Sequence, residues 1–162
     1  MMNDVRHSPM DVPVDPILQE MVGKYPRLFH GSTPRAHSDI QPGWKALVDG
    51  LCYRINGMLT EEKARLFAVK QIKEKLGTLR FYFSFDRDVE QPFAEQHPAG
   101  TIEMGSDVDV DRNIETFGKI RAAIEVAISL SNTTCSVCGQ PGRMRHLDGL
   151  LSVRCDDHSS VR

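Results

Sequence analysis

TLRFYFSF, residues 78–85, alternates large apolar side chains with polar or amphipathic ones. Successive side chains of an extended strand point to opposite faces, so this stretch predicts a strand with one apolar and one polar face. A lone strand leaves its backbone N–H and C=O groups unpaired, and this strand therefore needs a partner. The apolar face consists of Leu79, Phe81, Phe83 and Phe85.

The segment before this strand supports two predictions. Thr60 could cap a helix that ends at Gly77, because four apolar residues between them have helical spacing. Alternatively, residues 67–75 form a strand that turns at residues 76–78 into TLRFYFSF. Since the strand needs a partner, we expect a short helix near Thr60 followed by a β-hairpin. The helical alternative rests on Leu66, Val69, Ile72 and Leu76.

Two amphipathic helices are predicted to pack on the apolar face of the hairpin. The first lies in GWKALVDGLCYRINGML, residues 43–59, where Cys52 is expected to be a buried apolar residue. The second lies in RNIETFGKIRAAIEVAISLS, residues 112–131. Residues 15–132 are therefore expected to form an α+β domain with a small antiparallel sheet. The apolar face of the first helix is Trp44, Leu47, Val48, Leu51, Cys52 and Ile55, and that of the second is Ile114, Phe117, Ile120, Ile124, Ala127 and Ile128.

The first residues of the chain differ in composition from the predicted domain. Residues 1–14 contain two prolines and few apolar side chains, which predicts a mobile N-terminal arm. Asp15 and Pro16 have the order of a helix N-cap followed by proline at the first helical position, and Gly23 is a suitable C-terminal stop. Residues 30–43 are rich in Gly, Pro, Ser and His and predict a loop.

The net charge of −2 hides two segments of opposite charge. Residues 63–80 contain six basic residues and one acid, whereas residues 86–111 contain eight acids and one base. A nucleic-acid-binding domain of this size is usually basic overall, and a DNA mimic is far more acidic, so neither extreme fits.

The acidic segment, residues 86–111, ends in DVDVD, which invites comparison with a calcium loop. The calcium motif requires glycine at its sixth position and glutamate at its twelfth, where this chain has Arg112 and Gly118. We interpret the segment instead as a long loop, with room for a short strand at residues 101–104, that leads into the second helix.

Three of the four cysteines lie in TTCSVCGQPGRMRHLDGLLSVRCDDHSSVR, residues 133–162. They form a C-x2-C pair and a C-x2-H pair with sixteen residues between the pairs. Two tight turns of this kind can direct four ligands at one tetrahedral ion, and Gly139 eases the first turn by allowing positive φ. The spacing predicts a zinc-ribbon-like module with zinc as cofactor. Its predicted ligands are Cys135, Cys138, Cys155 and His158.

Other interpretations of the cysteines fit less well. A thioredoxin-like redox pair needs its C-x-x-C at a strand-to-helix junction, whereas this pair follows a predicted helix. His146 could replace His158 as a ligand or act as a base, but it lacks the two-residue spacing. With four protein ligands the coordination is closed, which is typical of a structural rather than a catalytic site.

Several motifs together resemble a group of uncharacterised small bacterial and prophage proteins. These motifs are KYPRLF, W-x2-L-V-x2-L in the first helix, QIKEKLGTLRFYF, and the terminal C-x2-C-G-x-P-G and C-D-D-H. The resemblance covers most of residues 24–158, and it implies a phage or mobile-element setting and zinc at the four predicted ligands. It implies no activity, and it does not extend to the acidic segment.

We expect a cytoplasmic protein of the bacterial host cell with no membrane partner. No apolar run approaches the roughly 20 residues of a membrane helix, and residues 1–16 lack the apolar core of a secretory signal. In the reducing cytoplasm, clustered cysteines indicate metal binding rather than disulfides.

The closed metal site and the lack of a catalytic motif favour a non-enzymatic accessory protein that binds a partner protein, such as a host defence factor or a component of the phage machinery. Two alternatives stay open. The basic residues, with Tyr82 for stacking, could bind nucleic acid, or the scattered histidines His30, His37, His97 and His146 could form the metal centre of a nuclease. The expected partner-binding residues are Lys70, Lys73, Lys75, Arg80, Arg143 and Arg145.

Overall fold

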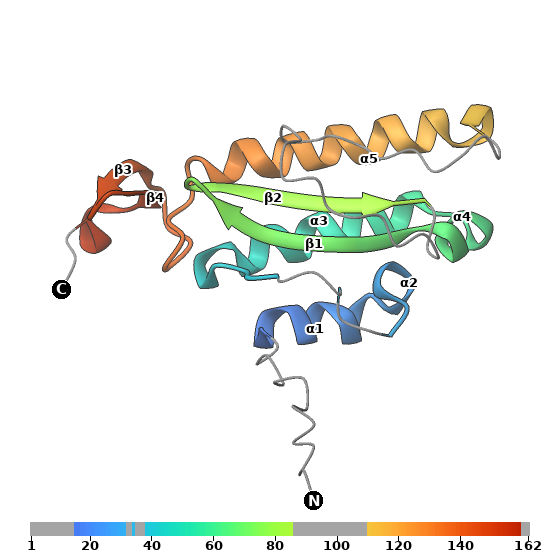
Figure 1. The fold of residues 1–162 in the computed structure, drawn as a ribbon, viewed down its shortest axis with the longest axis horizontal. Helices are drawn as coiled ribbons and strands as arrows, with labels where there is room; N and C mark the ends of the chain where they lie inside the picture. Colours follow the sequence, from blue (N-terminus) through green and yellow to red (C-terminus); the bar gives the residue numbers. More distant parts are fainter. Residues whose placement is uncertain (1–14, 32–33, 35–37, 86–109, 160–162) are drawn as a thin grey trace, which may run out of the picture.

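The computed structural model describes residues 15–31, 34, 38–85 and 110–159 (Figure 1). The expectations for the N-terminal arm, residues 1–14, for the short strand at residues 101–104 and for residues 107–109 of the calcium-like motif lie outside these residues, while the last two residues of that motif begin α5. The described elements, in chain order, are α1 (Pro16–Lys24), α2 (Pro26–Phe29), η1 (Pro42–Trp44), α3 (Lys45–Met58), α4 (Glu61–Leu66), β1 (Ala68–Lys75), β2 (Thr78–Ser84), α5 (Val110–Ser131), β3 (Arg143–Leu147), β4 (Leu150–Arg154) and η2 (Asp156–His158).

The predicted hairpin is confirmed. β1 and β2 pair antiparallel, and Leu79, Phe81 and Phe83 of β2 are buried while the residues between them are half-buried. The preceding segment also has the expected form, because Thr60 caps α4 by accepting a hydrogen bond from the Lys63 amide at 3.3 Å. The fold class is thus α+β with small antiparallel sheets.

A β-bulge in β1 explains why this segment also resembled a helix. The register shifts between Val69 and Gln71, so that Val69 pairs with Phe83 while Ile72 pairs with Phe81. Both side chains are buried although they are three residues apart, since a bulge moves the alternation by one residue. The other two members of the apparent helical stripe, Leu66 and Leu76, are exposed.

The core lies between the hairpin, α3 and α5. α5 packs along α3 and β2, and the hairpin crosses in front of α3 (Figure 1). The apolar face predicted for this helix is confirmed: Trp44 at the end of η1 is buried, Leu47 is partly buried, and the rest of the face on α3 is buried, namely Val48, Leu51, Cys52 and Ile55. For α5 the prediction was wrong at one end: Ile120, Ile124 and Ala127 are buried, but Ile114 is 57% exposed because the buried face of α5 turns away from it.

The KYPRLF motif joins the first helices to the rest of the fold. Lys24 donates hydrogen bonds of 2.7 Å to both carboxylate oxygens of Asp49 on α3, and the Tyr25 hydroxyl donates to the same carboxylate at 2.5 Å. Arg27 donates to the carbonyl of Leu59 at 2.7 Å. Asp15 caps α1 as predicted, by accepting from the Leu18 amide at 2.9 Å.

Candidate metal centre

Four side chains from two distant segments meet beside the small β3–β4 sheet. Cys135 and Cys138 lie in the turn that follows α5, while Cys155 precedes the short helix η2 after β4 and His158 is the last residue of that helix. The sulfur and ring-nitrogen atoms of these residues all lie within 4.8 Å of one another. The structure therefore brings together all four ligands predicted from the sequence, close enough to hold a metal ion.

The separations fit the dimensions of a tetrahedral zinc site. Zn–S bonds of about 2.3 Å place two sulfurs about 3.8 Å apart, and a sulfur and a nitrogen about 3.6 Å apart. The Sγ atoms of Cys138 and Cys155 are 3.7 Å apart. Nδ1 of His158 is 3.1 Å from Sγ of Cys155 and 3.8 Å from Sγ of Cys135. Three sulfurs and one imidazole are the donor set that a borderline-soft ion such as zinc prefers.

Backbone amides from both cysteine-bearing segments prepare Cys135 to act as a thiolate. Burial raises the pKa of its thiol, but the backbone amides of Cys155, Cys138 and Val137 donate to the sulfur and together lower the pKa to about 6. The thiolate is the form that binds metals. By contrast, burial in the core raises the pKa of Cys52 to about 12, which agrees with its predicted role as an apolar residue.

The turn that carries Cys135 and Cys138, here called the first metal-binding turn, is packed tightly against the start of α3. The Gly43 amide donates to the carbonyl of Ser136 at 2.8 Å, and the indole N–H of Trp44 donates to the carbonyl of Thr134 at 3.0 Å. A Cβ atom on Gly43 would lie 2.1 Å from the carbonyl oxygen of Cys135. The turn thus docks on backbone atoms, and no side chain larger than hydrogen fits at position 43.

The β3–β4 hairpin also touches the turn of the first hairpin. A Cβ atom on Gly77, between β1 and β2, would lie 2.5 Å from the sulfur of Met144 on β3. The Thr78 hydroxyl donates to Oδ1 of Asn132 at 3.1 Å, and the Leu79 amide donates to Oγ of Ser131 at 3.1 Å. The C-terminal segment therefore supports the end of the main sheet, and in Figure 1 the β1–β2 turn lies beside the end of α5, on the side of the molecule that carries β3 and β4.

The alternative histidine roles find little support. His146 lies exposed on β3, paired in register with Leu151, and the metal-binding cluster does not include it. Nε2 of His30 lies 2.5 Å from the carbonyl oxygen of Phe67, where it links α2 to the start of β1. His37 and His97 lie outside the described residues. The redox alternative needs its cysteine pair at a strand-to-helix junction, and it also fails because Cys135 and Cys138 follow the helix α5.

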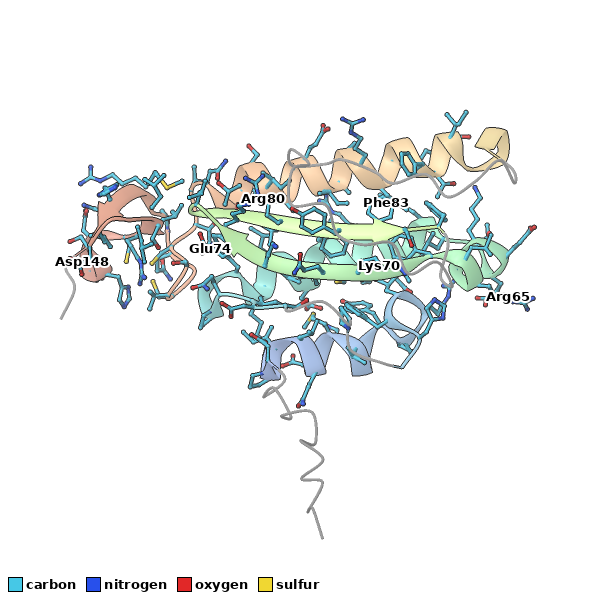
Figure 2. All side chains as sticks on the ribbon, in the orientation of Figure 1. Arg65, Lys70, Glu74, Arg80, Phe83 and Asp148 are labelled. Atoms are coloured by element: carbon cyan, nitrogen blue, oxygen red, sulfur yellow. The ribbon has the colours of Figure 1, made fainter. Side chains whose placement is uncertain are left out.

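The six predicted partner-binding residues fall into two separate groups. Lys73 lies opposite Arg80 on the outer face of the hairpin, Lys75 ends β1, and Lys70 lies at the bulge (Figure 2). Nζ of Lys73 is 5.8 Å from the ring centre of Tyr82 on the same face. The other two residues, Arg143 and Arg145, belong to β3. Both form ion pairs with the carboxylate of Asp156, and the guanidinium nitrogen of Arg143 lies 3.4 Å from its Oδ1.

One feature of this surface was missed from the sequence. Leu76 is 63% exposed at the tip of the hairpin, and its backbone has a φ of +54°. Leu76 and Gly77 both have positive φ, as in a tight turn that favours Asn, Asp or Gly at each position. The other hairpin uses the usual pair, Asp148–Gly149. The sequence contained a signal for this feature, because Leu76 and Gly77 stand between two strands, where Asn-Gly or Asp-Gly is the expected pair.

The chain matches no protein-family model, no curated protein and no solved structure. The resemblance to small bacterial and prophage proteins therefore stays a prediction. In the part of the chain that the structure describes, no helix is long and apolar enough to cross a membrane.

Proposed function

We propose that the four-residue cluster holds one structural zinc ion in a ribbon-like module. The donor set, the tetrahedral separations and the closed coordination support this proposal. The zinc would fix the first metal-binding turn, which packs on Gly43 and Trp44, and would thereby support the hairpin tip through the contact between Gly77 and Met144.

We further propose that the protein is a non-enzymatic, cytoplasmic accessory protein of a phage or prophage, and that it binds a partner protein through the tip of the β1–β2 hairpin. The observation that carries this proposal is Leu76. A leucine in a left-handed turn destabilises the fold, and it remains exposed to water. Most of this side chain is left in solvent by the fold, and it can fill a pocket on a partner as an apolar anchor.

The charge around this anchor indicates the chemistry of the partner. Lys75 is exposed beside Leu76, and Lys73 and Arg80 follow on the outer face. Further along the hairpin the outer face is closed, since Gln71 is only 6% exposed. The contact surface is therefore the turn end, and its partner is expected to present an apolar pocket with acidic residues around it.

A capture experiment from the native host tests this function. Tagged, zinc-loaded protein is compared with the Leu76→Asn variant and with the triple variant Lys73→Glu, Lys75→Glu, Arg80→Glu. Arg65→Glu on α4 serves as a charge-reversal control away from the tip (Figure 2). A protein partner retained by the control but lost with both tip variants, before and after nuclease treatment, supports the proposal. A partner retained by all four proteins would refute it.

Nucleic-acid binding is the second candidate, and one observation favours it. Lys73, Arg80 and Tyr82 lie on one face of the hairpin, where two basic side chains share a face with an aromatic ring that a base could stack on. The pairing of Arg143 and Arg145 with Asp156 weakens this candidate, because the carboxylate neutralises part of their charge. Loss of the captured material on nuclease treatment, with binding that falls steeply as salt rises, would promote it to first place.

A further inference from the structure

One face of the β3–β4 hairpin gathers three arginines around a hollow. Arg143 on β3 and Arg154 on β4 are direct partners in the strand register, and Arg145 lies two residues further along β3. All three side chains therefore leave the same face of the hairpin. Together with Asp156 they line a hollow of about 220 Å³, whose other lining residues are Pro141, Gly142 and Cys155.

The opposite face of the same hairpin packs inward. Val153 is fully buried, and the sulfur of Met144 lies against Gly77 at the turn of the first hairpin. Met144 and Val153 are partners in the register, so they share the face that alternates with the arginines. Packing of the fold thus accounts for one face of the hairpin and leaves the arginines on the other.

The arginines are unfavourable for the hairpin itself. Like charges directly opposite each other on paired strands destabilise a sheet, and Arg143 stands opposite Arg154. The carboxylate of Asp156 pairs with both Arg143 and Arg145, whereas Arg154 donates its Nε–H to the neutral hydroxyl of Ser152 at 2.9 Å. Three cations thus meet one carboxylate. The proposed zinc site, a divalent ion with three thiolates, adds one negative charge and leaves the group net positive.

The guanidinium of Arg145 is already held in place to bind an anion. Its side chain is 19% exposed, its Nε–H donates to the carbonyl of Arg154 at 3.3 Å, and a terminal nitrogen donates to Asp156. The side chain of Asp156, by contrast, is 87% exposed and can rotate into solvent at little cost. Asp156 therefore places a carboxylate oxygen where an oxygen of an external anion could bind.

We propose that the hollow binds the terminal phosphate of a phosphate monoester, which replaces the Asp156 carboxylate between the arginines. Guanidinium groups bind phosphate oxygens through paired hydrogen bonds. A monoester presents three terminal oxygens to the three arginines, whereas a phosphodiester within a nucleic-acid strand presents two. The volume of the hollow is below the roughly 300 Å³ at which pockets for whole small molecules begin, so the phosphate enters and the rest of the ligand stays outside.

Isothermal titration calorimetry of the full zinc-loaded chain tests the proposal with three small probes. We expect methyl phosphate, a simple monoester, to bind at least as tightly as inorganic phosphate. Dimethyl phosphate, the matching diester, should bind more weakly because it has one terminal oxygen fewer. Leu76→Asn should bind methyl phosphate as wild type does, which separates this site from the proposed partner contact at the hairpin tip.

Two substitutions should change the affinity in opposite directions. Arg145→Gln should weaken the binding of methyl phosphate about tenfold or more, because it removes a charged donor. Asp156→Asn should strengthen the binding, because the competing carboxylate loses its charge, and loss of folding cannot produce this effect. Asp157→Asn is the matched control. It removes the same charge from an exposed neighbour that does not line the hollow, and it should change the affinity clearly less.

Several results would overturn the proposal. Wild-type protein that does not bind methyl phosphate, or binds dimethyl phosphate equally well, has no monoester site. A protein that binds inorganic phosphate but rejects methyl phosphate has a site for the free ion instead. Unchanged or weaker binding by Asp156→Asn would show that this carboxylate does not compete for the arginines. Elemental analysis accompanies each variant, and if Arg145→Gln loses its zinc, the comparison of Asp156→Asn with Asp157→Asn decides.

Discussion

The backbones of Gly43 and Gly139 lie in direct contact. A Cβ atom on Gly139 would lie 2.9 Å from the carbonyl oxygen of Gly43, and one on Gly43 would lie 2.6 Å from the amide nitrogen of Gly139. Gly139 has a φ of +78° within the first metal-binding turn. Two residues nearly a hundred positions apart thus allow the turn to rest on the start of α3, and they couple the metal centre to the core.

Gly43→Ala should therefore be strongly destabilising. The added methyl group would overlap the carbonyl oxygen of Cys135, a backbone atom that cannot rotate away. We expect a loss of about 3 kcal/mol or more in the free energy of unfolding, measured by chemical denaturation. Gly57→Ala in α3 is the matched control, because nothing lies within 4 Å of its Cβ position. It should be neutral or stabilising by up to about 1 kcal/mol. Similar losses for the two variants would show that the turn does not dock here.

Cys138→Ser should abolish the proposed zinc binding and unfold the C-terminal segment. Structural zinc contributes roughly 10–16 kcal/mol of apparent binding in small zinc domains, so a site that loses one thiolate is not expected to survive. Elemental analysis should find one zinc per wild-type chain and none in the variant. Cys52→Ala is the control, since that thiol is buried in the core away from the cluster and its loss should leave the zinc content unchanged. Wild-type protein without zinc would contradict the prediction.

Phe81→Ala should destabilise the fold by about 3–5 kcal/mol, the usual loss when a core phenylalanine is truncated. Phe81 is 4% exposed and lies opposite Ile72 in the hairpin. Ile114→Ala is the comparison for an apolar residue that this structure leaves in solvent, and it should change the unfolding free energy by less than about 0.5 kcal/mol in dilute protein. Equal effects of the two substitutions would mean that the faces of β2 or α5 are assigned wrongly.

Asp49 should make the stability of the protein sensitive to acid. Hydrogen bonds from Lys24 and then Tyr25 lower the pKa of this carboxyl below its ordinary value of 3.8. A carboxyl whose pKa is lower in the folded state contributes stability that is fully present above the unfolded pKa. This contribution is lost as the pH falls through the folded pKa. The difference in unfolding free energy between wild type and Asp49→Asn should thus be constant from about pH 5 to 7 and shrink below about pH 4. A difference that grows as the pH falls would contradict the assignment.

The local patterns were predictable from the sequence. Alternation identified β2, helical spacing identified α3, and the spacing of Cys135, Cys138, Cys155 and His158 identified the four residues that the structure brings together as a candidate metal site, because each pattern depends on neighbouring residues alone. Patterns disturbed by a single residue were harder to interpret. The bulge after Val69 gave β1 a helical spacing, and the three-residue spacing of Ile114 to Phe117 and of Phe117 to Ile120 made the exposed Ile114 resemble a core residue.

Contacts between distant segments were not predictable. Nothing in the sequence near Gly43 indicates that Cys135 and Gly139 will pack on it, since this contact depends on how α3 and α5 lie together. For the same reason the grouping of the basic residues was only partly foreseen. Lys73 and Arg80 lie opposite each other because the hairpin forms. Arg143 and Arg145 lie in a separate sheet, where both pair with Asp156.

Leu76→Asn should separate folding from the proposed partner binding. Asparagine adopts positive φ more readily than leucine, so the substitution should relieve backbone strain at the hairpin tip and stabilise the fold by about 1 kcal/mol. It also removes the exposed apolar side chain, so partner capture should weaken although the protein is more stable. Thermal unfolding of the zinc-loaded protein measures the first effect, and capture from host extract measures the second. Leu150→Asn, at the exposed tip of the other hairpin, is the control for loss of a surface leucine and should not weaken capture. Unchanged capture by Leu76→Asn would remove the anchor from the proposal, whereas lower stability would mean that Leu76 contributes to the fold after all.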